Sequence, residues 1–135
     1  MIPAGVDTNR FGELVLENER VLRRFGDKGV DLSRAVAFEF SVLFDAKDRL
    51  TACRDELKRR FTGQPLEFAD DYGPWCTTSD AENGEFELRL PVVMRPRAED
   101  VSFLEAVIGL EAEKFAGTDV AWEFADARNN TKGLN

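Results

Sequence analysis

The spacing of apolar residues changes between the first two segments of the chain. Over residues 7–24, apolar side chains recur every three or four positions between charged ones, which predicts an amphipathic helix capped by Asp7 or Thr8. Gly26 is expected to break this helix. Over residues 34–44 the period becomes two, which predicts a half-buried strand. A sheet with one face in the core is therefore expected.

A second amphipathic helix and a short strand are predicted next. Asp45 can cap a helix over residues 46–61. Gly63 and Pro65 then prevent its continuation. Residues 66–69 are predicted to form a short strand, so the first strand and this one are joined by a helical crossover.

The second half of the chain repeats this order. Pro74 restricts residues 75–78 to an edge strand or a bulge, so their state is left open. The pair Asn83 and Gly84 predicts a two-residue hairpin turn, and Gly117 is well placed as the left-handed C′ residue of a helix. Three elements with clear periodicity accompany these signals: a strand over residues 86–90, a helix over residues 99–116 and a strand over residues 120–124.

The order of the elements predicts an α+β fold. Within residues 26–126 it is strand, helix, two strands, helix, strand, which is typical of the ferredoxin-like split βαβ fold: a four-stranded antiparallel sheet with two helices on one face. Residues 1–25 would add an extra N-terminal helix, and residues 127–135 a flexible tail. The helix-facing side of the sheet is expected to carry large apolar side chains: Val36, Phe38, Phe40, Phe86, Leu88, Leu90, Val120, Trp122 and Phe124.

The opposite sheet face is expected to be open and acidic. It would carry Glu39, Glu87 and Glu123 among small side chains, with Arg89 as its cation. Sheets of this topology that bind RNA stack bases on exposed aromatic side chains, and no aromatic residue is predicted on this face. The face is therefore a candidate surface for binding protein, with no direct contact to nucleic acid.

Charge and composition narrow the function further. The 135 residues carry a formal net charge of −8, so the chain as a whole repels phosphate. It has no histidine, which removes the commonest general base and neutral metal ligand. Its two cysteines are too few for a disulfide framework, and Cys53 lies on the apolar stripe of a helix. We expect no catalytic residue, no metal site and no cofactor.

The location of the protein is predicted from signals that the sequence lacks. The N-terminus has no charged-then-apolar signal segment, and no apolar run approaches the length needed to span a membrane. A cytoplasmic protein without membrane contact is expected. The sequence leaves its oligomeric state open.

An acidic loop with two aromatic residues is the most specific recognition candidate. Asp70 and Asp71 lie close to Tyr72 and Trp75, and aromatic side chains in an acidic loop can anchor a basic peptide. The alternatives are that the carboxylates are simply solvated and that Trp75 covers the sheet edge. Together with the open face, the candidate partner-binding residues are Asp70, Asp71, Tyr72, Trp75, Glu39, Glu87 and Glu123.

Two segments resemble a known family. The opening run Leu22-Arg23-Arg24-Phe25-Gly26-Asp27, followed by Asp31, Arg34 and Val36, and the closing pattern Gly117-x-Asp119-x-x-Trp122-Glu123 are similar to those of the regulator of ribonuclease E activity B family. The resemblance covers residues 22–124. Ala121 stands where the family has glycine, and the loop over residues 70–85 is longer than expected. Both departures bear on the partner more than on the fold.

The resemblance implies a fold and a function. Family members have the ferredoxin-like split βαβ fold and are small, acidic, cytoplasmic proteins without catalytic activity. They bind ribonuclease E outside its catalytic centre and alter which transcripts it degrades. The expected function is thus a non-catalytic, acidic, protein-binding regulator whose partner is a basic segment of a ribonuclease similar to ribonuclease E.

Two other functions fit the same residues. An immunity protein that neutralises a basic toxin would also be small, compact and acidic, and a toxin gene next to this one would favour that interpretation. An enzyme would need a deep pocket with two converging carboxylates, because no other catalytic pattern is present.

Overall fold

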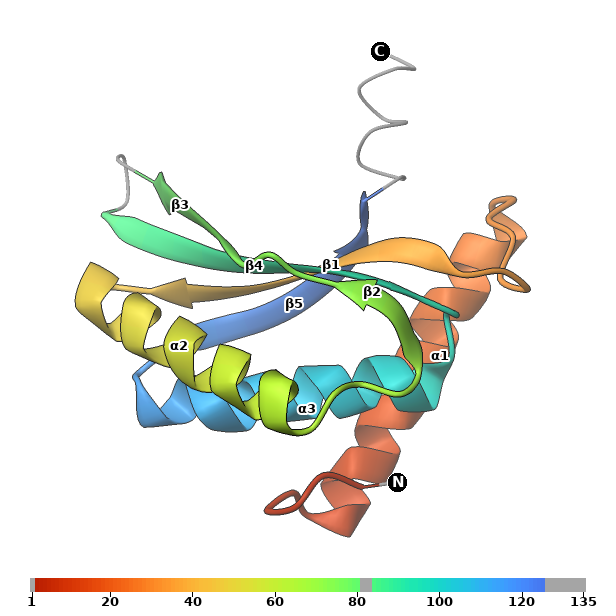
Figure 1. Cartoon of the computed structure of the whole chain (residues 1–135). Coiled ribbons are helices and arrows are strands. Elements are labelled where there is room, and N and C mark those ends of the chain that lie inside the picture. The colour runs from red at the N-terminus through yellow and green to blue at the C-terminus, as the bar shows by residue number, and fades with distance from the viewer. Residues whose placement is uncertain (1, 81–83, 126–135) are drawn as a thin grey trace.

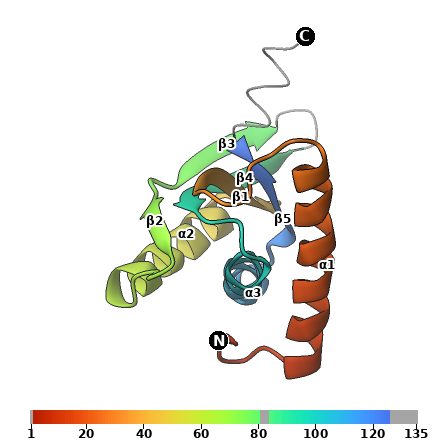
Figure 2. The same cartoon turned by 90° about the vertical axis from the view of Figure 1, so that its right-hand side faces the viewer.

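A single antiparallel sheet is covered on one face by two helices. The computed structural model describes residues 2–80 and 84–125. Figure 1 shows α2 and α3 side by side beneath the sheet, and Figure 2 shows α1 standing beside α3. The elements, in chain order, are α1 (Thr8–Asp27), β1 (Val36–Phe44), α2 (Lys47–Gly63), β2 (Ala69–Tyr72), β3 (Cys76–Asp80), β4 (Glu85–Met94), α3 (Ala98–Lys114) and β5 (Thr118–Phe124).

The sheet has the strand order of the predicted fold. Its order is β2-β4-β1-β5, all neighbours are antiparallel, and β3 also pairs with β4. β2 and β3 follow one another along one edge of β4, separated by a cis peptide bond between Gly73 and Pro74. The five strands therefore occupy four positions. The prediction of a ferredoxin-like α+β fold with an extra N-terminal helix is confirmed.

The edge strand differs from its prediction at both ends. β2 begins at Ala69 instead of residue 66, because Leu66 is buried in the preceding loop and its N–H donates to the hydroxyl of Tyr72 at 3.2 Å. The strand resumes as β3, a question the sequence left open. Gly84, with φ of 68°, lies at the start of the hairpin into β4, while Asn83 and residues 127–135 lie outside the described residues.

Alternation along the strands places the core as predicted. In β1 and β4 every second side chain is buried, and the two strands pair over their whole length. Phe38 and Phe124 meet edge to face with their ring centroids 4.9 Å apart, and Phe25 at the end of α1 meets Phe124 at 4.6 Å. The largest fully buried side chains are Phe38, Phe40, Phe44, Leu50, Leu57, Leu88, Leu90, Met94, Leu104 and Ile108, with Val42 and Val92.

A buried asparagine attaches α1 to the rest of the fold. The side-chain amide of Asn18 donates to Ser102 Oγ at 2.8 Å and to Glu105 Oε1 at 3.1 Å, both on α3. Its carbonyl oxygen accepts from Trp122 Nε1 at 3.1 Å, on β5. An unpaired polar group in this position would be costly, so the network fixes where α1 lies on α3.

The helix ends confirm one predicted cap and correct two other signals. The Asp7 side chain accepts from the Arg10 backbone N–H at 3.0 Å and caps α1. Asp45 does not cap α2: Ala46 is the N-cap residue, and Asp45 instead pairs with Arg49 at 3.4 Å. Gly26 does not break α1, which continues to Asp27.

The end of α3 corrects the predicted role of Gly117. Ala116, with φ of 60°, takes the left-handed C′ position, and the Gly117 N–H donates to the Ala112 carbonyl at 2.8 Å in a Schellman motif. Gly117 is required for a different reason. A Cβ atom added there would lie 2.8 Å from the Phe44 ring, so only glycine lets the chain pass this close.

Candidate functional site

The three predicted glutamates of the open sheet face are brought together. Glu39 lies opposite Glu123 in the β1–β5 register, and Glu87 is on neighbouring β4. Arg89 lies among them: its Nη1 is 3.2 Å from Glu39 Oε1, and its Nε donates to Glu87. One guanidinium therefore contacts two of the three carboxylates of this face.

The two aromatic residues of the predicted acidic loop pack inward. The Tyr72 hydroxyl donates to the Phe61 carbonyl at 3.3 Å, at the end of α2. The Trp75 ring stacks on Phe61 with a centroid distance of 6.4 Å and an interplanar angle of 3°. Both rings therefore connect the sheet edge to α2. This arrangement agrees with the alternative that Trp75 covers the sheet edge.

The paired carboxylates of this loop do not share one site. Asp70 and Asp71 are both exposed, and the register of β2 on β4 shifts between Ala69 and Asp71. Asp71 pairs with Val93, whereas Asp70 lines a hollow at the end of the sheet. Because of this bulge the two carboxylates cannot be treated as a single cation-binding pair.

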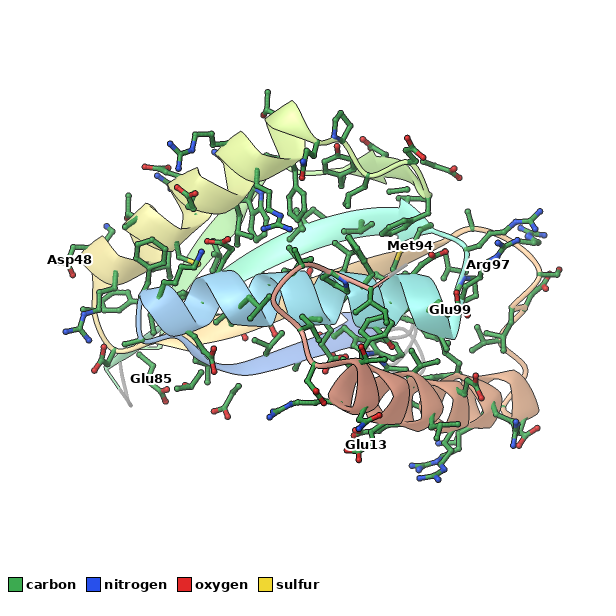
Figure 3. All side chains as sticks on the ribbon, turned by 90° about the horizontal axis from the view of Figure 1, so that it is seen from below. Glu13, Asp48, Glu85, Met94, Arg97 and Glu99 are labelled. Carbon is green, nitrogen blue, oxygen red and sulfur yellow. The ribbon has the colours of Figure 1, made fainter. Side chains whose placement is uncertain are left out.

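An acidic groove between α1 and α3, called here the α1–α3 groove, was not predicted. Its volume is about 910 Å³. Its walls are residues 5–17 and residues 105–120, and Figure 3 shows the N-terminal segment crossing α3 beside it. Half-buried aliphatic side chains line it. On α3, the small residues Ala106 and Gly109 leave room for the groove. The aliphatic lining residues are Val6, Leu14, Leu110 and Val120.

Carboxylates dominate the charge of the α1–α3 groove. Six carboxylates line it against the single cation Arg10, which leaves a formal charge of −5. Burial raises the pKa of Glu105, and the hydrogen bond from Asn18 opposes this shift. A cation placed in the groove would therefore relieve an electrostatic cost that the free protein carries. The six carboxylates are Asp7, Glu13, Glu17, Glu105, Glu113 and Asp119.

Part of the α1–α3 groove was visible in the sequence. Glu13 and Glu17 are four residues apart on α1, and Glu105, Gly109 and Glu113 share one face of α3 at the same spacing. Each stripe alone is typical of a solvated helix face. Only the packing of α1 on α3 turns the two stripes into one groove.

The described cysteine and the acidic side chains were also compared with the needs of thiol chemistry and metal binding. Burial, with a smaller effect of Glu111, raises the pKa of the Cys53 thiol to about 12, so it is not a thiolate at neutral pH. Among residues 2–80 and 84–125, no three acidic or cysteine side chains are grouped to hold a metal ion. No helix within the same residues has an apolar stretch long enough to cross a bilayer.

No family model matches the chain, and no curated protein matches it either. The resemblance to the ribonuclease E regulators therefore stays a prediction.

Proposed function

We propose that this protein is a non-catalytic regulator that binds a basic segment of another protein. The observation that carries the proposal is the α1–α3 groove, with its aliphatic lining and six carboxylates. Concave, partly apolar surfaces with convergent polar groups are the default binding sites of proteins. Opposite charge would speed the encounter with a basic partner and help to select it.

The lining defines what the bound segment should look like. Aliphatic side chains of the partner would contact Leu14, Leu110 and Val120, and its lysines or arginines would face Glu13, Glu17 and Glu113. The aliphatic contacts would supply most of the affinity, because exposed ion pairs each contribute little. A purely basic peptide without apolar residues should therefore bind weakly.

The partner is proposed on the resemblance of residues 22–124. It makes a basic, non-catalytic segment of a ribonuclease similar to ribonuclease E the first candidate, in the cytoplasm. Binding there would alter RNA degradation without any catalytic group from this chain. The open sheet face and Asp70 and Asp71 are the competing surfaces for the same partner.

The test is a charge reversal confined to the groove. Glu13→Lys with Glu17→Lys should weaken binding of labelled peptides from the basic region of ribonuclease E by at least about tenfold, measured by fluorescence anisotropy at low salt. Glu19→Lys with Asp27→Lys is the matched control, because both residues are exposed on α1, outside the groove, and change the net charge equally.

Two outcomes would redirect the proposal. If Asp70→Lys with Asp71→Lys abolishes binding and the groove variant does not, the partner docks at the sheet edge. If no ribonuclease peptide binds but a small basic toxin does, the protein is an immunity protein.

A further inference from the structure

A second hollow lies at the end of the sheet where α3 begins. Its volume is about 530 Å³, and it lies between the segment before β1, the loop before β2 and the turn from β4 into α3. Figure 3 labels Arg97 and Glu99 at this end of α3, beside the end of β4 at Met94. The side chains that matter here are Arg34, Arg95, Arg97, Phe68, Asp70 and Asp100. We call it the arginine hollow.

The local backbone holds two of the arginines close together. The Arg97 N–H donates to the Arg95 carbonyl at 2.8 Å, which closes a three-residue γ-turn around Pro96. Pro96 is buried, and its ring restricts φ, so the turn has little freedom. The turn therefore fixes the backbone positions of Arg95 and Arg97, and both residues line the hollow.

Two of the three arginines of the hollow form no ion pair among the described residues. Among the described residues, neither Arg95 nor Arg97 has a carboxylate within 4.0 Å. Arg34 forms a long ion pair with Asp31, at 3.8 Å, and the side chains of Arg34 and Asp31 are both largely exposed. Burial raises the pKa of Asp100, and the charge of Arg97 opposes this shift. Three guanidinium groups thus line the hollow, and its two carboxylates, Asp70 and Asp100, do not pair with Arg95 or Arg97.

We propose that the arginine hollow binds a small phosphomonoester whose ring packs against Phe68. Guanidinium groups bind phosphate oxygens through paired hydrogen bonds, and the two charges of Arg95 and Arg97 match those of a dianion. Phe68 is half-buried, meets Phe103 edge to face at 5.8 Å and forms the apolar wall. Asp70 and Asp100 can accept hydrogen bonds from hydroxyl or amino groups of the same ligand. The volume is within the range of small-molecule sites.

The site is independent of the proposed regulator function. Its lining shares no residue with the α1–α3 groove. A protein that binds no basic peptide could still bind the phosphomonoester, and the reverse also holds.

Isothermal titration calorimetry with the full chain tests the proposal. The probes are adenosine 5′-monophosphate, adenosine and inorganic phosphate. We expect the monophosphate to bind more tightly than phosphate, and adenosine to bind at least about tenfold more weakly than the monophosphate because it lacks the charged group. No binding of the monophosphate at millimolar concentration, or equal binding of adenosine, would overturn the site.

Matched variants assign the binding to these arginines. Arg95→Gln with Arg97→Gln should weaken monophosphate binding at least about tenfold. Arg20→Gln with Arg23→Gln makes the same charge change on exposed positions of α1 outside the hollow and should leave binding unchanged. Equal loss in both variants would mean that only net charge matters and would contradict the proposal. Phe68→Leu should reduce the preference for the monophosphate over inorganic phosphate.

Discussion

The arginine hollow and the α1–α3 groove lie on different parts of the same helix, α3, and carry opposite charge. The arginine hollow lies at the start of α3 and has three guanidinium groups against two carboxylates. The α1–α3 groove follows the rest of α3 and has six carboxylates against one guanidinium. The dipole of α3 adds to both, because a helix is positive at its N-terminus and negative at its C-terminus. A net charge of −8 therefore agrees in sign with the groove and does not predict the positive charge of the arginine hollow.

The regions also differ in what builds them. The arginine hollow depends on a short turn and on segments of the sheet layer, whereas the groove exists only because α1 packs on α3. A change that loosens α1 should remove one region and spare the other. This difference allows each proposal to be tested against the other within one molecule.

The largest effect is expected from Asn18→Ala. It removes three hydrogen bonds and leaves buried polar groups of Ser102 and Trp122 without their partner, so the free energy of unfolding should fall by about 2–4 kcal/mol. Urea unfolding measures the loss, and Gln64→Ala, at an exposed position, is the control. Basic-peptide binding should be lost while monophosphate binding persists. Loss of both together would show that the two regions are not independent.

A smaller effect is expected from Gly117→Ala, at one end of the groove. The added Cβ would lie 2.8 Å from Phe44, and relief requires movement of a buried ring, so the expected cost is about 1–3 kcal/mol. Gly63→Ala is the matched control, since a Cβ there meets nothing within 4 Å. Thermal unfolding of both variants measures the difference. Equal melting temperatures would mean that the chain relaxes at Gly117 without strain.

The smallest effect is expected from Glu105→Gln, and it depends on pH. Burial raises the folded-state pKa of Glu105 above 4.5, so the contribution of this carboxyl to stability is full below pH 4.5 and is lost as pH rises through the folded pKa. The variant lacks this titration. At pH 7 it should be more stable than the wild type, with no gain near pH 4, because the charged form of Glu105 is the one that burial disfavours.

The control and the contrary result for this prediction are simple. Glu19→Gln makes the same change at an exposed position of α1. Chemical unfolding at a series of pH values compares the three proteins. A Glu105→Gln variant that is less stable at pH 7 would mean that the hydrogen bond with Asn18 outweighs the cost of burial.

Much of the fold could be predicted because the spacing of apolar residues within one helix or strand indicates which of its side chains are buried. The alternation in β1 and β4 identifies their core face, and the spacing in α2 identifies Leu50, Cys53, Leu57 and Phe61 as its buried stripe. Asp7 caps α1 because capping is a contact between residues three apart. Such signals lie within one element, so the chain carries them without its partners.

The tertiary structure alone decided which elements face one another. Asn18 and Trp122 are 104 positions apart, and no local pattern pairs them. The bulge that separates Asp70 from Asp71 likewise depends on how β2 pairs with β4. Gly117 is needed because Phe44 packs close to it, and Ala116 takes the left-handed position instead. The sequence by itself determined the helices, the buried faces of β1 and β4, and the overall charge. Packing between distant elements determined the two hollows, because their opposite charges come from side chains that meet only after folding.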